Sequence, residues 1–127
     1  MTDNAALRRT GLVGIVLQLA LVGAAYYAPW IGSFAVRFAG MMISATVGYL
    51  YAMDVGLGFR RAALGGAIVG GIPFLIGIAL SQMLGDRIED PLALWTLISV
   101  LTGAIGGLFG EFSIRWNAAL QRWLRNR

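Results

Sequence analysis

The sequence predicts an all-α membrane protein in which four transmembrane helices form an antiparallel bundle with both termini in the cytoplasm. Composition is the first observation behind this fold class. Hydrophobic residues make up 58% of the 127 residues and charged residues only 13%, and the mean hydropathy is +0.75. A soluble domain is closer to about half apolar and about a quarter charged. The other two observations are that the apolar residues form four long runs and that arginines lie at the ends of those runs.

Each apolar run is close to the roughly 20 residues that a helix needs to cross about 30 Å of hydrocarbon. The connections between the runs are short and rich in glycine, proline or charged residues. Short connections between long helices favour antiparallel neighbours. We therefore expect a single membrane domain over residues 1–127. The predicted transmembrane segments cover about residues 11–29, 34–53, 62–84 and 92–112.

The arginines predict the orientation of this bundle. If four helices alternate in direction, eight of the ten arginines fall on one side of the membrane, and only Arg37 and Arg87 fall on the other. Arg87 also lies within an acidic patch of Asp86, Glu89 and Asp90. Because cytoplasmic loops carry the excess of basic residues, we expect a multi-pass protein of the bacterial inner membrane with both termini inside.

The first apolar run has an alternative interpretation as a cleaved signal peptide, because Arg8 and Arg9 precede it. The apolar core of a signal peptide is usually only about 7 to 15 residues long, and this run is longer. Tyr26, Tyr27 and Trp30 at its far end are typical of the aromatic belt at a membrane surface. We expect the segment to be a retained membrane helix.

Residues 113–127 predict a short basic amphipathic helix after the fourth segment. Tryptophans and leucines recur there at helical spacing, with arginines on the remaining positions. Such a helix lies on an anionic membrane surface. The alternative is an extension of the fourth helix whose arginines reach back to the interface. The predicted membrane-surface residues are Arg115, Trp116, Arg122, Trp123 and Arg125.

The run RRAALGGAIVGGIPFLIGIAL at residues 60–80 would be a poor helix in water, because glycine costs about 1 kcal/mol and proline about 3 kcal/mol relative to alanine. In lipid, small residues spaced four apart let helices approach closely and pack. The glycines then serve packing within the bundle, packing against another subunit, or a hinge at Pro73, which frees a backbone carbonyl and kinks the helix. The predicted packing residues are Gly40, Ser44, Gly48, Gly66, Gly70, Gly103, Gly106, Gly107 and Gly110.

A faint internal repeat accompanies these glycines. RRTGLVGIV at residues 8–16 resembles RRAALGGAIV at residues 60–69, and Ile-Ser followed by four residues and a glycine occurs at 43–48 and at 98–103. Two hairpins in the same orientation form a parallel repeat in some transporters. Apolar sequence of low complexity also gives such echoes by chance, so both interpretations stay open.

Four polar residues are candidates for a transport path, because polar groups are costly to bury in lipid. These are Gln18, the deepest of them, together with Arg37, Asp54 and Glu111. Glu111 precedes Arg115 by four residues, the favourable order for a helical ion pair. The structural alternative is interhelical hydrogen bonding for Gln18, snorkelling or pairing with the acidic patch for Arg37, and pairing with arginines for the two carboxylates.

The composition excludes several classes of chemistry. Cysteine, histidine and lysine are all absent, which excludes disulfides, thiolate or imidazole metal ligands, and histidine or lysine as a catalytic base. We expect no enzyme activity, no cofactor and no metal site. The net charge of +4 does not indicate nucleic-acid binding, because the arginines occupy positions typical of membrane topology.

Three hypotheses for function remain. The leading one is a non-catalytic accessory or assembly subunit of a larger membrane complex, whose partners are membrane lipids and other membrane subunits. The alternative is a homo-oligomeric channel or small transporter for an ion or small solute. A holin-like pore, suggested by small size and a basic tail, is the third.

Overall fold

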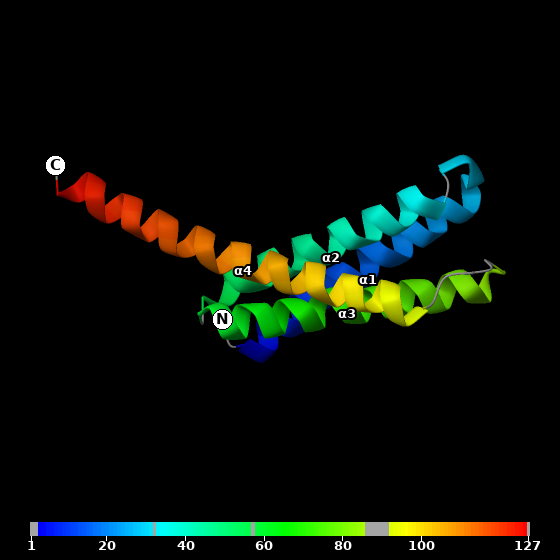
Figure 1. Cartoon of the computed structure of the whole chain (residues 1–127), viewed down its shortest axis with the longest axis horizontal. Helices are drawn as coiled ribbons and strands as arrows, with labels where there is room; N and C mark the ends of the chain where they lie inside the picture. The colour runs from blue at the N-terminus through cyan, green and yellow to red at the C-terminus, as the bar shows by residue number, and fades with distance from the viewer. Residues whose placement is uncertain (1–2, 32, 57, 86–91, 127) are drawn as a thin grey trace.

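A computed structural model of the chain shows an all-helical protein (Figure 1). The structure describes residues 3–31, 33–56, 58–85 and 92–126. All four of its long helices are long and apolar enough to cross a membrane, which confirms the predicted all-helical class and the presence of four helices of that length and apolarity. The elements are α1 (Asp3–Tyr27), the short 3-10 helix η1 (Pro29–Ile31), α2 (Ser33–Val55), α3 (Phe59–Met83) and α4 (Leu92–Arg125).

Two helices extend beyond the predicted apolar runs: α1 at its start and α4 at its end. α1 begins at Asp3, before the apolar run that starts at Gly11. An acidic residue in a first turn interacts favourably with the helix dipole.

The predicted acidic patch around Arg87 lies outside the described residues, as does Arg127.

The predicted separate tail helix is not formed, because α4 continues without interruption from Leu92 to Arg125. Between Glu111 and Arg125 the sequence contains neither glycine nor proline, the two residues that most readily end a helix. The tail is therefore an extension of α4, as the alternative interpretation had it.

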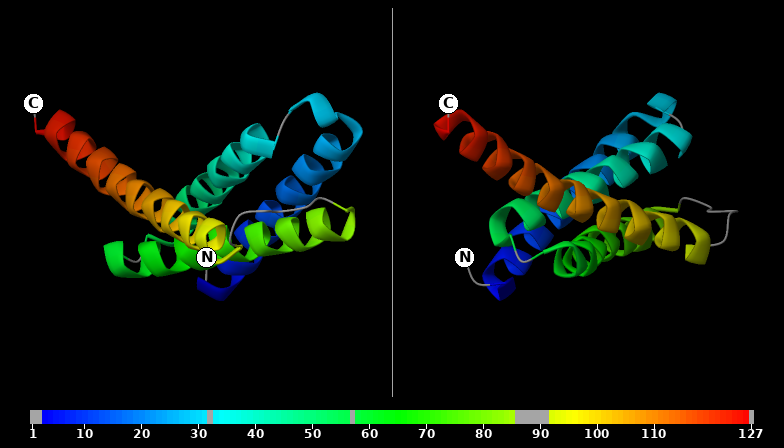
Figure 2. Two further views of the ribbon diagram at one scale, coloured as in Figure 1. Left: turned by 45° about the vertical axis from the view of Figure 1, so that its right-hand side comes forward. Right: turned by 60° about the vertical axis from the view of Figure 1, so that its left-hand side comes forward.

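The helices are arranged around a central pair, α2 and α3. α4 packs against both of them on one side, and α1 packs against both on the other (Figure 1). The last third of α4 departs from the bundle, and the further views show it projecting away from the other helices (Figure 2). We call residues 112–125 the α4 extension, because Glu111 is the last buried residue of this helix.

Backbone, rather than large side chains, forms the contact between α2, α3 and α4. A Cβ atom added at Gly48 or at Gly66 would collide with the carbonyl oxygen of Gly103, and one added at Gly106 with the carbonyl of Ala45. Helices can come this close only where side chains are absent. All nine predicted packing residues are buried, and each faces another helix of the same chain: Gly40, Ser44, Gly48, Gly66, Gly70, Gly103, Gly106, Gly107 and Gly110.

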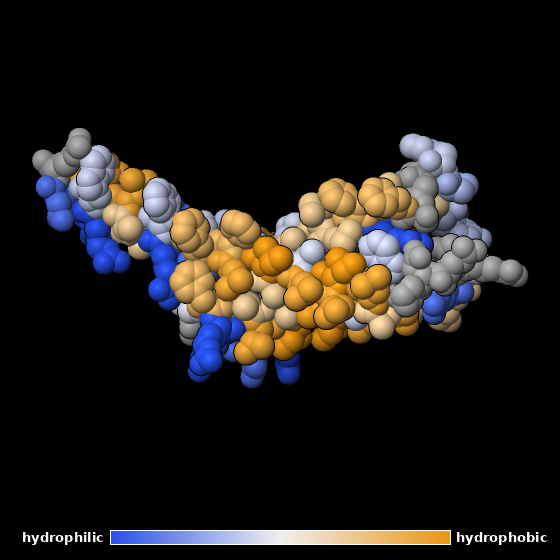
Figure 3. Space-filling view, in the orientation of Figure 1, coloured by the Kyte–Doolittle hydropathy of each residue, from blue (hydrophilic) through white to orange (hydrophobic). Residues whose placement is uncertain are grey.

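Large apolar side chains lie on the outside of the bundle. Residues such as Leu12, Phe38, Leu64 and Leu101 are exposed on four different helices, and Figure 3 shows an apolar surface along the bundle. A soluble protein rarely exposes so continuous an apolar surface. A lipid environment favours this arrangement, in which small residues pack inside the bundle and large apolar residues face outward.

The two copies of the Ile-Ser motif meet in space. Ser44 Oγ lies 2.6 Å from Ser99 Oγ, and Gly48 contacts Gly103. α2 and α4 therefore cross at residues that correspond in the sequence repeat. Two hairpins packed in the same orientation would give this contact, and the duplication itself stays a hypothesis.

We expect Gly103→Ala to lower the free energy of unfolding by about 1–3 kcal/mol, the usual cost of inserting a methyl group into a packed interior. The added Cβ would meet the backbone of Gly66. Gly11→Ala is the control, since nothing lies within 4 Å of a Cβ there and alanine is the better helix former. SDS unfolding of the purified protein in mixed micelles, followed by circular dichroism, measures both. Equal stability of the two variants would contradict the close contact.

Candidate functional site

A cluster of hydrogen bonds joins the three helices in the middle of the bundle. The Ser44 hydroxyl lies 3.0 Å from the carbonyl oxygen of Gly70, and the Ser99 hydroxyl lies 3.3 Å from the same atom. Both serines are buried. Each hydroxyl therefore has a partner inside the protein, and neither has a basic side chain beside it among these contacts. The cluster stabilises packing and offers no activated nucleophile.

Pro73 lies one turn further along α3, and the helix continues through it to Met83. Proline has no N–H, so the carbonyl of Val69 lacks its usual donor within the helix. The Pro73 ring packs closely against α1, since a Cβ added at Gly14 would lie 2.8 Å from Pro73 Cγ. The sequence had not marked Gly14, because it has no glycine four residues away. The hinge at Pro73 stays a prediction.

Gln18 is held between two glycines. Its side chain is only 3% exposed, and its amide nitrogen lies 3.0 Å from a Cβ position at Gly40 of α2 and 2.8 Å from one at Gly77 of α3. Its Oε1 is buried and has no hydrogen-bond partner among the described residues. Gln18 is thus a polar group buried between helices, with an unused acceptor.

Arg37 lies near the opposite end of α2 from Asp54. Its guanidinium carbon is 5.1 Å from the ring centroid of Trp95 in α4, a cation–π arrangement. Trp95 could not be identified as its neighbour from the sequence, because the two residues are brought together only by the packing of α2 against α4.

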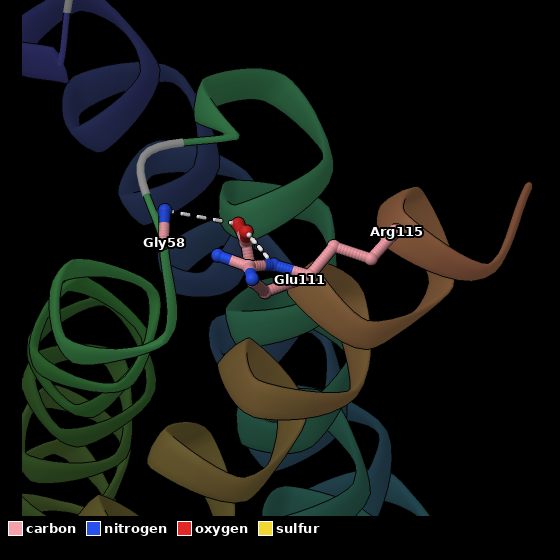
Figure 4. Close-up of polar contacts among 3 residues, drawn as sticks. All are labelled: Gly58, Glu111 and Arg115. Atoms are coloured by element: carbon pink, nitrogen blue, oxygen red, sulfur yellow. Dashed lines mark hydrogen bonds and ion pairs between the residues drawn. The ribbon is translucent and has the colours of Figure 1, made fainter. Parts of the chain in front are cut away.

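Glu111 is the most deeply buried carboxylate in the described chain, at 3% exposure. Figure 4 shows both of its oxygens engaged. The backbone N–H of Gly58 donates to Oε2 at 3.1 Å, and Arg115 Nε donates to Oε1 at 2.9 Å. The predicted ion pair is present. Gly58 has φ of 96°, a left-handed conformation that suits glycine, and this turn directs its N–H to the carboxylate.

Arg115 also packs its guanidinium over the ring of Phe59, with 4.6 Å between the guanidinium carbon and the ring centroid. Glu111 and Arg115 together therefore join α4 to the connection between α2 and α3 and to the start of α3. Charged hydrogen bonds of this kind are stronger than neutral ones. The sequence did not identify Gly58 and Phe59 as partners of Glu111 and Arg115, because both contacts depend on how the connection folds.

The same end of the bundle holds two further polar contacts. Asp54 pairs with the exposed Arg9 across 3.8 Å, and the hydroxyl of Tyr51 donates to Asp3. The start of α1, the end of α2, the start of α3 and the base of the α4 extension thus meet there. We call this the arginine-rich end, because five of the ten arginines belong to these segments: Arg8, Arg9, Arg60, Arg61 and Arg115.

The four residues predicted for a transport path do not form one linked site. Asp54 and Glu111 lie at the arginine-rich end, each paired with an arginine. Gln18 lies deeper, and no hydrogen bond or ion pair between described residues links it to either carboxylate. Within the part of the chain that the structure describes, no group of three His, Cys, Asp or Glu residues could hold a metal ion.

Comparison of the chain with protein-family models, with curated proteins and with solved structures finds no match in any of the three. The geometry of the chain itself therefore carries the functional argument.

We expect Glu111→Gln to lower the free energy of unfolding by about 1.5–3 kcal/mol, because hydrogen bonds to charged groups contribute roughly that much and Arg115 loses its counter-ion. Asp54→Asn is the control, since its pair with the exposed Arg9 should contribute less than about 1 kcal/mol. Unfolding in micelles compares the two. A larger loss of stability in Asp54→Asn than in Glu111→Gln would contradict this expectation and show that the pair of Asp54 with Arg9 contributes more.

Gln18→Met tests whether the buried amide is satisfied. Because Oε1 has no partner among the described residues, removing the amide should leave stability unchanged or raise it by up to about 1 kcal/mol. Ser99→Ala provides the contrast, since it removes a buried hydroxyl that has partners and should cost about 1 kcal/mol. A marked loss of stability in Gln18→Met would reveal a bonding partner for the amide in the membrane.

Proposed function

We propose that this protein is a non-catalytic accessory or assembly subunit of a larger complex in the bacterial inner membrane. Its four helices would cross the membrane as an antiparallel bundle with both termini in the cytoplasm. The convergence of three arginine-bearing segments at one end of the bundle, from α1, α3 and α4, supports this orientation, because basic residues favour the cytoplasmic side.

The state of Glu111 is the observation that carries the proposal. A carboxylate that captures or releases an ion or proton must exchange partners during transport. Both oxygens of Glu111 are engaged by the chain itself, one of them by an arginine, and Asp54 also has an arginine partner. These carboxylates attach helices to one another, which is the role expected of a structural subunit.

The surface for a partner differs from the one that the glycine pattern suggested. The glycines of α2, α3 and α4 are occupied within the chain, so they are closed to another subunit. Bulky substitutions such as Gly70→Leu or Gly107→Leu would disrupt the bundle itself and would not test association. A partner would instead meet the outer surface of the helices, where α1 has open space around Gly11 and Gly23.

A homo-oligomeric channel or small transporter is the second candidate, and the unpartnered Oε1 of Gln18 favours it. A free acceptor inside a membrane bundle is available to a passing solute or to water. None of the described contacts favours a holin-like pore over these two candidates.

Extraction from native membranes in a mild detergent, through a tag at the C-terminus, tests the proposal. We expect other membrane proteins to co-purify in fixed stoichiometry, identified by mass spectrometry. Gly23→Leu should reduce that yield, because a large side chain there blocks close approach of a helix while leaving the bundle intact. Leu12→Phe, a change at a position that is already large and exposed, is the control.

Recovery of the protein alone, as a discrete homo-oligomer, would contradict the accessory role. Liposomes containing only this protein would then be assayed for ion and solute flux, with Gln18→Ala and Glu111→Gln as the first variants. Flux that stops in Gln18→Ala would establish the second candidate.

A further inference from the structure

The α4 extension carries an apolar edge into a region where the bundle no longer covers it. Trp116 is 62% exposed, Leu120 45% and Trp123 51%. The spacing of these residues places them on one edge of the helix. The same edge continues back into the bundle through exposed residues that face outward: Leu101, Ile105, Phe109 and Phe112.

The other edge of the extension is basic. Arg115, Arg122 and Arg125 lie in it, and residues 112–127 contain no aspartate or glutamate. Figure 3 shows hydrophilic residues gathered along one edge of the projecting segment, with apolar residues beside them. Arg8, Arg60 and Arg61 are exposed at the arginine-rich end from which the extension departs, so this end of the bundle carries positive charge as well.

The length of α4 decides which environment the extension meets. Its apolar edge runs from Leu94 to Leu124, about 45 Å at 1.5 Å per residue. Fitting that length into about 30 Å of hydrocarbon would require a tilt of roughly 50°, beyond the range of about 0–40° seen for membrane helices. The hydrocarbon layer therefore cannot contain the whole apolar edge. In water, the tryptophans and leucines of the extension would be exposed to solvent. The remaining environment is the headgroup layer, where tryptophan and arginine are both favoured.

We propose that the α4 extension binds an anionic phospholipid surface, with Trp116, Leu120 and Trp123 at the boundary between headgroups and acyl chains and with Arg122 and Arg125 on lipid phosphates. The bond of Glu111 to Gly58 and the packing of Arg115 over the ring of Phe59 hold the base of the extension on the bundle. The position of the extension is therefore set by the fold. This inference requires that the helices span a membrane, and it does not depend on the accessory role.

The test uses the full-length protein in vesicles of phosphatidylcholine, with and without phosphatidylglycerol. Trp30→Phe and Trp95→Phe remove the other two tryptophans, so that fluorescence reports Trp116 and Trp123 alone. Brominated lipids quench tryptophan on contact. We expect brominated phosphatidylglycerol to quench more effectively than brominated phosphatidylcholine present in the same proportion.

Arg122→Gln with Arg125→Gln should abolish that preference, because each arginine near an anionic surface contributes roughly fivefold in affinity. Glutamine is also a good helix former, so the helix itself should persist, and circular dichroism checks this. Arg60→Gln with Arg61→Gln is the matched control, which removes two exposed arginines of the same end outside the extension and should retain the preference.

Two results would overturn the proposal. Equal quenching by the two brominated lipids would show contact with lipid but no selection for negative charge. Quenching by iodide in the water, with little quenching by either lipid, would place the extension in solution, free to meet a protein. Because the vesicles contain no other protein, neither result bears on whether the chain belongs to a larger complex.

Discussion

The fold depends on the backbone contact at Gly103, where α4 meets α2 at Gly48 and α3 at Gly66 and Gly70. Only because no side chain lies at these positions can the three helices come close enough for the Ser44 and Ser99 hydroxyls to reach the Gly70 carbonyl. In lipid, where the hydrophobic effect does not draw helices together, such packing and hydrogen bonding supply the association energy.

This contact also determines where α4 leaves the bundle. Two turns beyond Gly103, α4 reaches the connection between α2 and α3, and Glu111 binds Gly58 there. The carboxylate is shielded from solvent and engaged on both oxygens, which fixes the base of the α4 extension. The single helix α4 thus connects the glycine contact in the interior with the basic, aromatic α4 extension outside.

The sequence predicted the four helices because length, apolarity and arginine placement are properties of each segment alone. It predicted small packing residues, because spacing by four defines a helix face, but it could not say which helix each face meets. Gly14 escaped notice because its importance comes from Pro73, a neighbour supplied by another helix. Gly58 as the donor to Glu111 depends on the left-handed turn of the connection, and the continuity of α4 was one of two open interpretations.

The same contact limits how the bundle could move. Rotation of α4 about its axis would bring Thr102 or Ala104 to the place of Gly103, and even a single Cβ there collides with the Gly66 backbone. Helices α2, α3 and α4 therefore form a fixed unit. α1 meets this unit through side chains, at Pro73 and around Gln18 and, at the arginine-rich end, at Tyr51 and Asp54, and side-chain contacts tolerate the small sliding of packed helices by which proteins open and close. A sliding of α1 against this unit would open the surface on which the unused acceptor of Gln18 lies.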